Sequence, residues 1–525
     1  MWIEALIATT LVSAFVVFVA PNRVAGKLAF ALSLLPTAGS IWMYSRFGST
    51  GAEGNALLGG SLAFETNANW LALGPYSLNW HVGLDGISMP LLVLTTVLTP
   101  LAILAAWTPI DERQSQFYGL MLFMETSLLG VFAALDFFVW FVFWEMVLVP
   151  MYLLIGVWGG PRRKYAAIKF FVYTNVASLV MFIGFIALVF GLGDSVTSMD
   201  MPAIAQALND GGMTGFAGVG ANTLKVLAFF AMFLGFAVKV PVVPFHTWLP
   251  DAHVEAPTPV SIMLAGVLLK MGTYALLRFN FTMLPGVARD YALLIALFAV
   301  VSVIYGAMLA LAQTDLKRIV AYSSVSSMGY VILGLVAYTM YGVGGATFQM
   351  VAHGLISGLM FMAVGVIYNT THTRMVSDMS GLADRMPITV AVFVAGAFGY
   401  MGLPLMAGFA AEFFIFVGAF ESTVLAGTVL GTNGLAIITA IAMFGIVIVA
   451  GYLLMAMQQT LFGPFEVETD YDVGRAAFHD VAPLVVLVLL VILLGVDPNI
   501  FYTMIQDAVR DIPTVAQAAA TGGGH

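Results

Sequence analysis

The stretch GFAVKVPVVPFHTWLPDAH, residues 235–253, places Lys239 at the end of an apolar run and follows it closely with prolines. Proline removes a backbone donor and clashes with the preceding helical turn. We therefore expect Pro241 and Pro244 to break a helix close to Lys239 and to free backbone carbonyls there. The stretch predicts a broken helix that carries an ionisable group at its break.

The composition indicates that such helices lie in a membrane. Of 525 residues, 61% are hydrophobic and 9% are charged, whereas roughly 25% are charged in an ordinary soluble domain. Apolar runs of about 20 residues recur from end to end with short polar joints. The net charge of -9 is spread through loops, which argues against a nucleic-acid surface. The absence of cysteine excludes disulfides and any cysteine-bound iron-sulfur cluster or zinc site in this chain.

The apolar runs predict an all-α membrane protein with about fourteen transmembrane helices. Two longer connections separate them, residues 47–83 and residues 193–221, and the second is expected to form a short helix after Pro202. The terminal AAATGGGH is expected to be disordered. The expected spans are residues 2–20, 27–46, 84–107, 116–134, 135–157, 166–192, 222–245, 257–279, 289–311, 316–338, 343–369, 387–418, 432–461 and 478–500.

The basic residues indicate the orientation of these spans. Most Lys and Arg residues fall in loops that follow odd-numbered spans. Because such residues collect on the cytoplasmic side, both termini should face away from the cytoplasm or mitochondrial matrix.

Ionisable residues recur inside the expected spans. Glu145 lies near the centre of the fifth span, in FVFWEMVLVP, and Lys270 near the centre of the eighth, in SIMLAGVLLKMGTYALLR. An intramembrane charge is costly and usually has a partner and a function, although a lone one is also explained by a structural ion pair. Four more lie in the fourth, seventh, eleventh and twelfth spans: Glu125, Lys239, His353 and Glu412.

The twelfth span, like the seventh, contains a proline that is expected to break the helix. In GYMGLPLMAGFAAEF, Gly402, Pro404 and Gly408 are expected to interrupt the helix shortly before Glu412. Broken helices at matching positions indicate an inverted-repeat transporter, with unwound backbone along the ion path. Because five spans separate the breaks, spans 4–8 and 9–13 should form two inverted five-helix repeats. The expected division is residues 1–110, 111–280 for the first repeat, 281–462 for the second, and 463–525.

The histidines are ambiguous as sequence signals. His353 taken alone is explained equally well by a hydrogen bond between helices and by proton transfer, given its neighbours Gln349 and Ser357. Three others are expected at the cytoplasmic mouth in solvated or structural roles, with no metal-site spacing: His246, His253 and His372.

Several stretches carry a resemblance to a known family. They are FWEMVLVPMYLLIGVWGG, KVPVVPFHTWLPDAHVEAPTPVSIMLAGVLLKMGTY, DLKRIVAYSSVSSMGYV, VAHGL and GFAAEFFIF. Over nearly its whole length the chain resembles the antiporter-like membrane subunits of respiratory complex I, the proton-pumping NADH:quinone oxidoreductase, of the chain M or subunit 4 type.

The resemblance implies a proton relay. Glu145 would pair with Lys239, and Lys270 would hand protons onward. His353 would take the place of a histidine that the family often carries on span 11, and Glu412 would connect to the exit side. Ser327 stands where related chains often carry a histidine, so water or serine hydroxyls would bridge there. The resemblance also implies partner subunits that carry FMN, iron-sulfur clusters and quinone, and a bacterial inner (plasma) membrane or, alternatively, a mitochondrial inner membrane.

Other functions share these features. A subunit of a multisubunit sodium/proton antiporter or of a membrane-bound hydrogenase would have the same broken helices and lysines. An independent solute transporter should show polar side chains clustered around an organic ligand, and a structural anchor has no reason to keep this many core charges.

Overall fold

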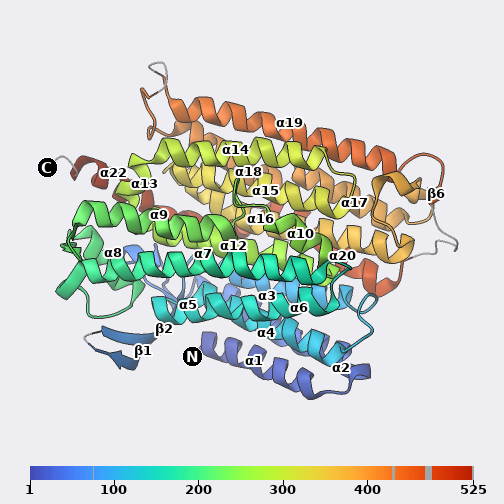
Figure 1. Ribbon diagram of the computed structural model, residues 1–525, viewed down its shortest axis with the longest axis horizontal. Helices are drawn as coiled ribbons and strands as arrows, with labels where there is room; N and C mark the ends of the chain where they lie inside the picture. Colours follow the sequence, from blue (N-terminus) through green and yellow to red (C-terminus); the bar gives the residue numbers. More distant parts are fainter. Residues whose placement is uncertain (75, 429–431, 468–475, 523–525) are drawn as a thin grey trace.

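The computed structural model describes all residues except 75, 429–431, 468–475 and 523–525. Figure 1 shows long helices running side by side in one bundle, with α1 and α2 at one edge and α19 at the opposite edge. Within the described residues, thirteen helices are long and apolar enough to cross a membrane. They are α1 (Trp2–Val19), α2 (Asn22–Phe47), α3 (Ser88–Ala105), α4 (Gln114–Ala133), α5 and α6 together (Phe137–Met146, Leu148–Trp158), α7 (Arg163–Leu192), α9 (Ala221–Lys239), the composite helix Thr258–Thr282, α14 (Ala292–Leu311), α15 (Leu316–Val336), α16 (Met340–Thr371), α19 (Gly434–Thr460) and α20 (Phe478–Val496).

The remaining expected span, the twelfth, is the broken one. It consists of α17 (Pro387–Tyr400) and α18 (Ala407–Glu421), which are separated by residues 401–406. Gly402 in this break has a φ of +63°. Gly408, expected to interrupt the helix, instead lies inside α18, where an added Cβ would come within 2.2 Å of the Gly399 carbonyl oxygen. Its role is therefore close packing between the two half-helices, while Pro404 lies in the break itself.

The seventh span breaks at the opening stretch of sequence, as expected. α9 ends at Lys239, and α10 (Trp248–Glu255) begins after an irregular segment that contains Pro241 and Pro244. The carbonyl of Val238 accepts a 2.9 Å hydrogen bond from Trp248 Nε1. Because side chains satisfy backbone groups that the break releases, the irregular segment is stable within the bundle.

The two broken helices occupy equivalent places in the two five-span repeats. The first repeat runs from α4 to the helix Thr258–Thr282, and the second runs from α14 to α19. In the first, α7 packs along α9, and in the second, α16 packs along α18. The odd number of spans per repeat gives the two copies opposite orientations, as in inverted-repeat transporters.

The helix Thr258–Thr282 is less regular than its sequence suggests. It consists of α11 (Thr258–Met263), a π-helical turn η3 (Leu264–Leu268), α12 (Leu269–Ala275) and a second π-helical segment η4 (Leu276–Thr282). π-helical turns occur often at functional sites. Lys270 lies directly after the first of them.

The connections contain more structure than the sequence predicted. The loop expected at residues 47–83 holds η1 (Ala56–Leu58) and an antiparallel hairpin of β1 (Ala63–Leu73) and β2 (Tyr76–Leu84). The helix expected after Pro202 is α8 (Met201–Asn209). The other short elements are η2 (Gly193–Ser195), β3 (Gly215–Phe216), β4 (Val219–Gly220), α13 (Pro285–Asp290), η5 (Val376–Asp378), β5 (Met379–Ser380), η6 (Leu382–Asp384) and β6 (Glu466–Val467).

The C-terminal tail differs from its prediction. It forms two helices, α21 (Asn499–Val509) and α22 (Ile512–Gly522), so most of AAATGGGH is helical and the last three residues lie outside the described part. α21 buries Phe501, Tyr502 and Ile505 against the bundle. This apolar face explains why the segment is ordered although it is too short to span a membrane.

Candidate functional site

Lys239 is held inside the bundle at the end of α9. Its side chain is 1% exposed, and Nζ makes no hydrogen bond to any described residue. The Nζ atom lies 5.0 Å from the centroid of the Trp144 ring, within the range of a cation–π interaction. An aromatic face therefore takes the place of a hydrogen-bond partner for this ammonium group.

Glu145 lies next to Trp144 on α5. Its Oε2 accepts a 3.3 Å hydrogen bond from Asn175 Nδ2, whereas its Oε1 is buried and unpartnered among the described residues. The charges of Glu145 and Lys239 act on one another through space, but the two residues form no direct ion pair in this structure. The contact implied by the family resemblance is thus replaced by a separated pair, with the Trp144 ring against the lysine.

α9, which ends at Lys239, packs directly against α12, which carries Lys270. An added Cβ at Gly272 would lie 3.2 Å from Lys239 Cβ and 2.7 Å from Val240 Cγ2. Any larger residue at this position would push α12 away from the end of α9. Gly272 follows Lys270 by two residues, so this close approach fixes the spacing between the two lysine-bearing segments.

Lys270 and His353 form the most direct contact of the site. Lys270 Nζ lies 2.7 Å from His353 Nδ1 and also donates to the carbonyl of Ala265, which lies in the π-helical turn η3. Both side chains are fully buried. While the lysine is protonated, Nδ1 accepts its hydrogen bond, and the ring proton then resides on Nε2. His353 Nε2 has no partner among the described residues, so the ring has one nitrogen on the lysine and one free to exchange a proton elsewhere.

Glu412 faces the break in the twelfth span. Its side chain is 5% exposed, and its Oε2 is unpartnered within the described chain. An added Cβ at Gly402 would lie 2.6 Å from this oxygen. The carboxyl group therefore points at the unwound segment, as the position of the glutamate after the break predicted.

Two expected accessory residues stand apart from these contacts. Glu125 on α4 is fully buried, and neither of its carboxylate oxygens has a hydrogen-bond partner among the residues described. Ser327 on α15 is buried, but none of the hydrogen bonds described for this chain involves its hydroxyl. Neither residue is joined to Lys270 or His353 by a direct contact.

Comparison with known proteins identifies the family of the chain. A family model described as "NADH:quinone oxidoreductase/Mrp antiporter, TM" matches residues 134–439, and one described as "NADH-ubiquinone oxidoreductase chain 4, amino terminus" matches residues 57–132. The chain belongs to this antiporter-like family. The first match contains both broken helices and five of the ionisable residues expected inside the spans, namely Glu145, Lys239, Lys270, His353 and Glu412.

Individual members of the family align over most of the chain. The NAD(P)H-quinone oxidoreductase chain 4 3 of Trichormus variabilis is 39% identical over 99% of this chain and 91% of its own length. The NADH-quinone oxidoreductase subunit M of Rhodobacter capsulatus is 39% identical over 84% of this chain and 85% of its own. A chain of respiratory complex I from Thermus thermophilus superimposes with a TM-score of 0.82 at 26% identity, covering 100% of both chains. The antiporter-like fold, with its membrane helices and broken repeats, is therefore confirmed.

His253 is buried, so of the two roles expected from the sequence, solvated or structural, the solvated one is excluded. It is 0% exposed in α10, and both ring nitrogens lack partners among the described residues. Its ring stacks on Phe361 at a centroid distance of 4.2 Å, and the charges of Lys317 and Lys270 act on it. Its only sequence signal was its place between Lys239 and Lys270 in the long family motif.

The other two histidines of this group differ from one another. His246 is 7% exposed and lies between the rings of Tyr305 and Tyr322, at centroid distances of 6.1 and 6.2 Å. His372 is exposed. Only His372 matches the solvated environment expected from the sequence, and the described residues contain no group of His, Asp or Glu that could hold a metal ion.

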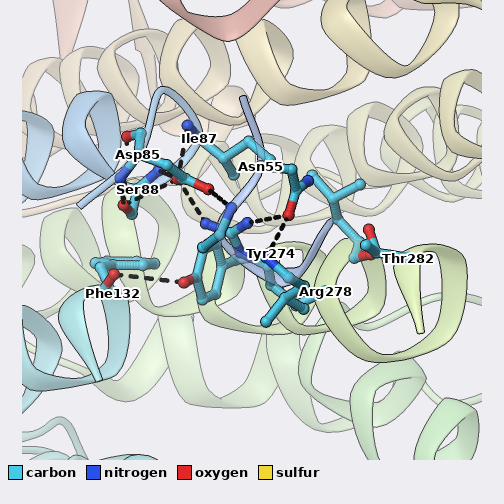
Figure 2. Close-up of polar contacts among 11 residues, drawn as sticks. Asn55, Asp85, Ile87, Ser88, Phe132, Tyr274, Arg278 and Thr282 are labelled. Atoms are coloured by element: carbon cyan, nitrogen blue, oxygen red, sulfur yellow. Dashed lines mark hydrogen bonds and ion pairs between the residues drawn. The ribbon is translucent and has the colours of Figure 1, made fainter. Parts of the chain in front are cut away.

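A buried ion pair anchors the helix that carries Lys270, and the sequence analysis did not identify it. Figure 2 shows the end of Arg278 surrounded by Asp85, Asn55 and Tyr274. Arg278 donates to Asp85 Oδ1 at 2.6 Å and to Asn55 Oδ1 at 3.2 Å, and its guanidinium lies 5.0 Å from the Tyr274 ring centroid. Asp85 also accepts from the backbone amides of Ala56, Ile87 and Ser88.

The ion pair with Arg278 also determines whether Asp85 is protonated. Burial by itself would raise the pKa of Asp85, but the Arg278 charge and the hydrogen bonds lower it below the usual value. Asp85 therefore remains a carboxylate, and it ties the connection between α2 and α3 to the end of the helix Thr258–Thr282. In the sequence, Arg278 was only one of the few basic residues on the outer side.

Proposed function

We propose that this chain moves protons across the membrane as one membrane-arm subunit of a quinone-reducing oxidoreductase. The observation that carries the proposal is the fully buried contact between Lys270 and His353. Two basic groups that share a hydrogen bond away from solvent can exchange a proton, whereas a structural role would favour a neutralising carboxylate. The names of the relatives, which include NADH-quinone oxidoreductase subunit M, support the assignment to such a complex.

The chain would contribute no redox chemistry of its own. It contains no cysteine, and the FMN, iron-sulfur clusters and quinone of the proposed complex would reside in partner subunits. The proposed location is a bacterial inner (plasma) membrane, since the relatives named above are bacterial. Neighbouring membrane subunits would cover part of the bundle's outer surface.

The geometry supports a sequence of charge-driven steps. When the Glu145 carboxylate approaches Lys239, its charge stabilises the protonated lysine, and when it withdraws, the lysine releases its proton more readily. The separated arrangement seen here, with Lys239 against Trp144, represents the second condition. The released proton would move toward Lys270 and then to His353. Charge movement elsewhere in the complex would drive the Glu145 carboxylate toward Lys239 or away from it.

Two lysines on one helix allow a matched test. Lys239 is buried at the end of α9, whereas Lys225, near the start of the same helix, is only partly buried. In inside-out membrane vesicles, Lys239→Met should lower the NADH-driven proton-pumping rate severalfold in the assembled complex, and Lys225→Met should leave it near the wild-type rate. The proposal fails if Lys239→Met pumps normally, or if the tagged chain copurifies without any NADH:quinone reductase activity, which would favour an antiporter complex.

A further inference from the structure

A gap remains between the last two members of the relay. His353 on α16 and Glu412 on α18 are both buried, and neither His353 Nε2 nor Glu412 Oε2 has a hydrogen-bond partner in the described chain. No hydrogen bond joins the two side chains among those described. A proton that reaches His353 therefore needs intermediate groups to reach Glu412.

Tyr400 lies on the His353 side of this gap. It is the last residue of α17, directly before the break in the twelfth span. Its ring centroid lies 5.8 Å from that of His353, at an interplanar angle of 68°. The residue is 5% exposed, and its hydroxyl is buried and unpartnered among the described residues. Its place beside His353, at the end of α17, distinguishes this tyrosine from the other buried tyrosines of the bundle.

Tyr452 lies on the Glu412 side. It belongs to α19, is 1% exposed, and its hydroxyl lies 2.5 Å from Ser323 Oγ on α15. It is near enough to both Tyr400 and Glu412 for electrostatic interaction with each. Tyr452 therefore interacts with both the tyrosine beside His353 and the carboxyl group at the break.

Two neighbouring residues are less suited to this position. Tyr330 also lies near Glu412, but its hydroxyl donates to the backbone carbonyl of Ala442 at 3.0 Å. Water or serine hydroxyls were expected to bridge near Ser327, for which no hydroxyl hydrogen bond is described. Two serines earlier on α15 lie beside tyrosine hydroxyls, Ser323 at Tyr452 and Ser324 at Tyr400.

We propose that Tyr400, Tyr452 and Ser323 form a row of hydroxyl groups that carries protons from His353 to Glu412. The proposal rests on the proposed function, because it supplies the missing part of the same pathway. A hydroxyl can accept one proton while it donates its own. As Lys270 gives its proton to His353 Nδ1, the Nε2–H bond of the ring breaks and an O–H bond forms at Tyr400. The original Tyr400 proton moves on to Tyr452, the Tyr452 proton protonates the Glu412 carboxylate, and Ser323 holds the Tyr452 hydroxyl in place through their hydrogen bond. Each hydroxyl ends with one proton, so no oxidant or lasting charge is required.

The test removes single oxygen atoms and keeps the rings. In the complete complex, Tyr400→Phe and Tyr452→Phe should each lower the proton-pumping rate per assembled complex about tenfold or more, within the range for loss of a proton-transfer group. Tyr502→Phe is the matched control, because Tyr502 is a buried tyrosine on α21 whose hydroxyl is also unpartnered among described residues. Its removal should leave pumping unchanged. NADH oxidation with an artificial acceptor measures the amount of assembled complex.

A second readout separates proton transfer from packing. If the hydroxyl row carries protons, the residual pumping of both tyrosine variants should show a larger solvent deuterium isotope effect than the wild type. Normal pumping in Tyr400→Phe and Tyr452→Phe overturns the row, as does a slow variant whose isotope effect matches that of the wild type. Lys270→Met distinguishes the two proposals. If this variant pumps normally, the proposed function itself is rejected. If it is defective while both tyrosine variants pump normally, only the hydroxyl row is rejected.

Discussion

Lys270 Nζ lies 2.7 Å from His353 Nδ1, although 83 positions separate the two residues in the chain. Lys270 follows a π-helical turn in the last span of the first repeat, and His353 lies on the third span of the second. The contact therefore joins the two repeats at the centre of the bundle. In the proposed relay, protons cross from one repeat to the other through this pair.

The first prediction concerns the titration of His353. His353→Gln keeps a polar side chain beside Lys270 but removes the group that can take up a proton. We expect the proton-pumping rate of the assembled complex to fall about tenfold or more, with little loss of assembly. His372→Gln, at an exposed site, should pump normally. Comparable rates in the two variants would show that His353 only positions the lysine.

A second prediction follows from the separation of Glu145 and Lys239. Removing one member of a buried ion pair costs about 3–5 kcal/mol, but no such pair exists here, and the hydrogen bond from Asn175 can be kept by a glutamine. Glu145→Gln should therefore reduce pumping while the thermal midpoint of the complex stays within about 2 °C of the wild type. A large loss of thermal stability would indicate that the pair is closed in the resting protein.

In contrast to Glu145→Gln, a substitution in the Asp85–Arg278 pair should lower the thermal stability. Both side chains are buried, so Asp85→Asn leaves the guanidinium without its counterion at a cost of about 3–5 kcal/mol. We expect a clearly lower thermal midpoint and a lower yield of the folded chain. Arg510, exposed and paired with Glu53, provides the control: Arg510→Gln should leave the midpoint almost unchanged. Equal stability of the two variants would contradict a structural role for the buried pair.

Gly402 allows backbone strain to be separated from the position of Glu412. Gly402 and Gly427 both have positive φ angles, +63° and +73°, so alanine at either site should cost about 1–2 kcal/mol of strain. Only at Gly402 would the new Cβ collide with a neighbour, Glu412 Oε2 at 2.6 Å, whereas Gly427 has open space around it. Gly402→Ala should therefore impair pumping, and Gly427→Ala should not. A defect of equal size in both would assign the effect to strain alone.

The external hairpin should respond to pH through His81. Burial alone would lower the pKa of His81, but its hydrogen bonds and ion pairs with Asp200 and Glu65 raise it above the usual value. Because the folded-state pKa is raised, this stabilisation is fully present below a pH of about 6.5 and is lost as the pH rises through the raised value. His81→Gln should lower the thermal midpoint at about pH 6 but much less at about pH 9. If His81→Gln lowers the thermal midpoint by the same amount at both pH values, the stabilisation does not come from a protonated His81.

The sequence predicted most of the fold because membrane helices have local signals. Long apolar runs placed the spans, and Pro241, Pro244 and Pro404 marked the two breaks. The hairpin β1–β2 was not predicted, although β2 alternates apolar and polar residues from Tyr76 to Val82, which is the pattern of a half-buried strand. The π-helical turn before Lys270 also has no local signature, and it depends on how that helix packs in the bundle.

The site was predicted less completely than the fold. The buried charges could be found one by one, because any ionisable residue inside an apolar run is unusual. Their partners could not, because contacts such as Lys270 with His353 join distant segments and depend on helix rotation. For the same reason the separation of Glu145 from Lys239 and the burial of His253 appear only in the structure.

The number of protons pumped per NADH oxidised tests the central claim most directly. It would be measured in sealed vesicles with a pH indicator, for the wild-type complex and for Lys270→Met, at matched amounts of assembled complex. If protons pass through Lys270, the variant should either pump fewer protons per NADH or lose NADH oxidation and pumping together, while an artificial electron acceptor is still reduced normally. A variant that oxidises NADH and pumps protons at the wild-type rate and ratio would show that protons do not pass through this residue.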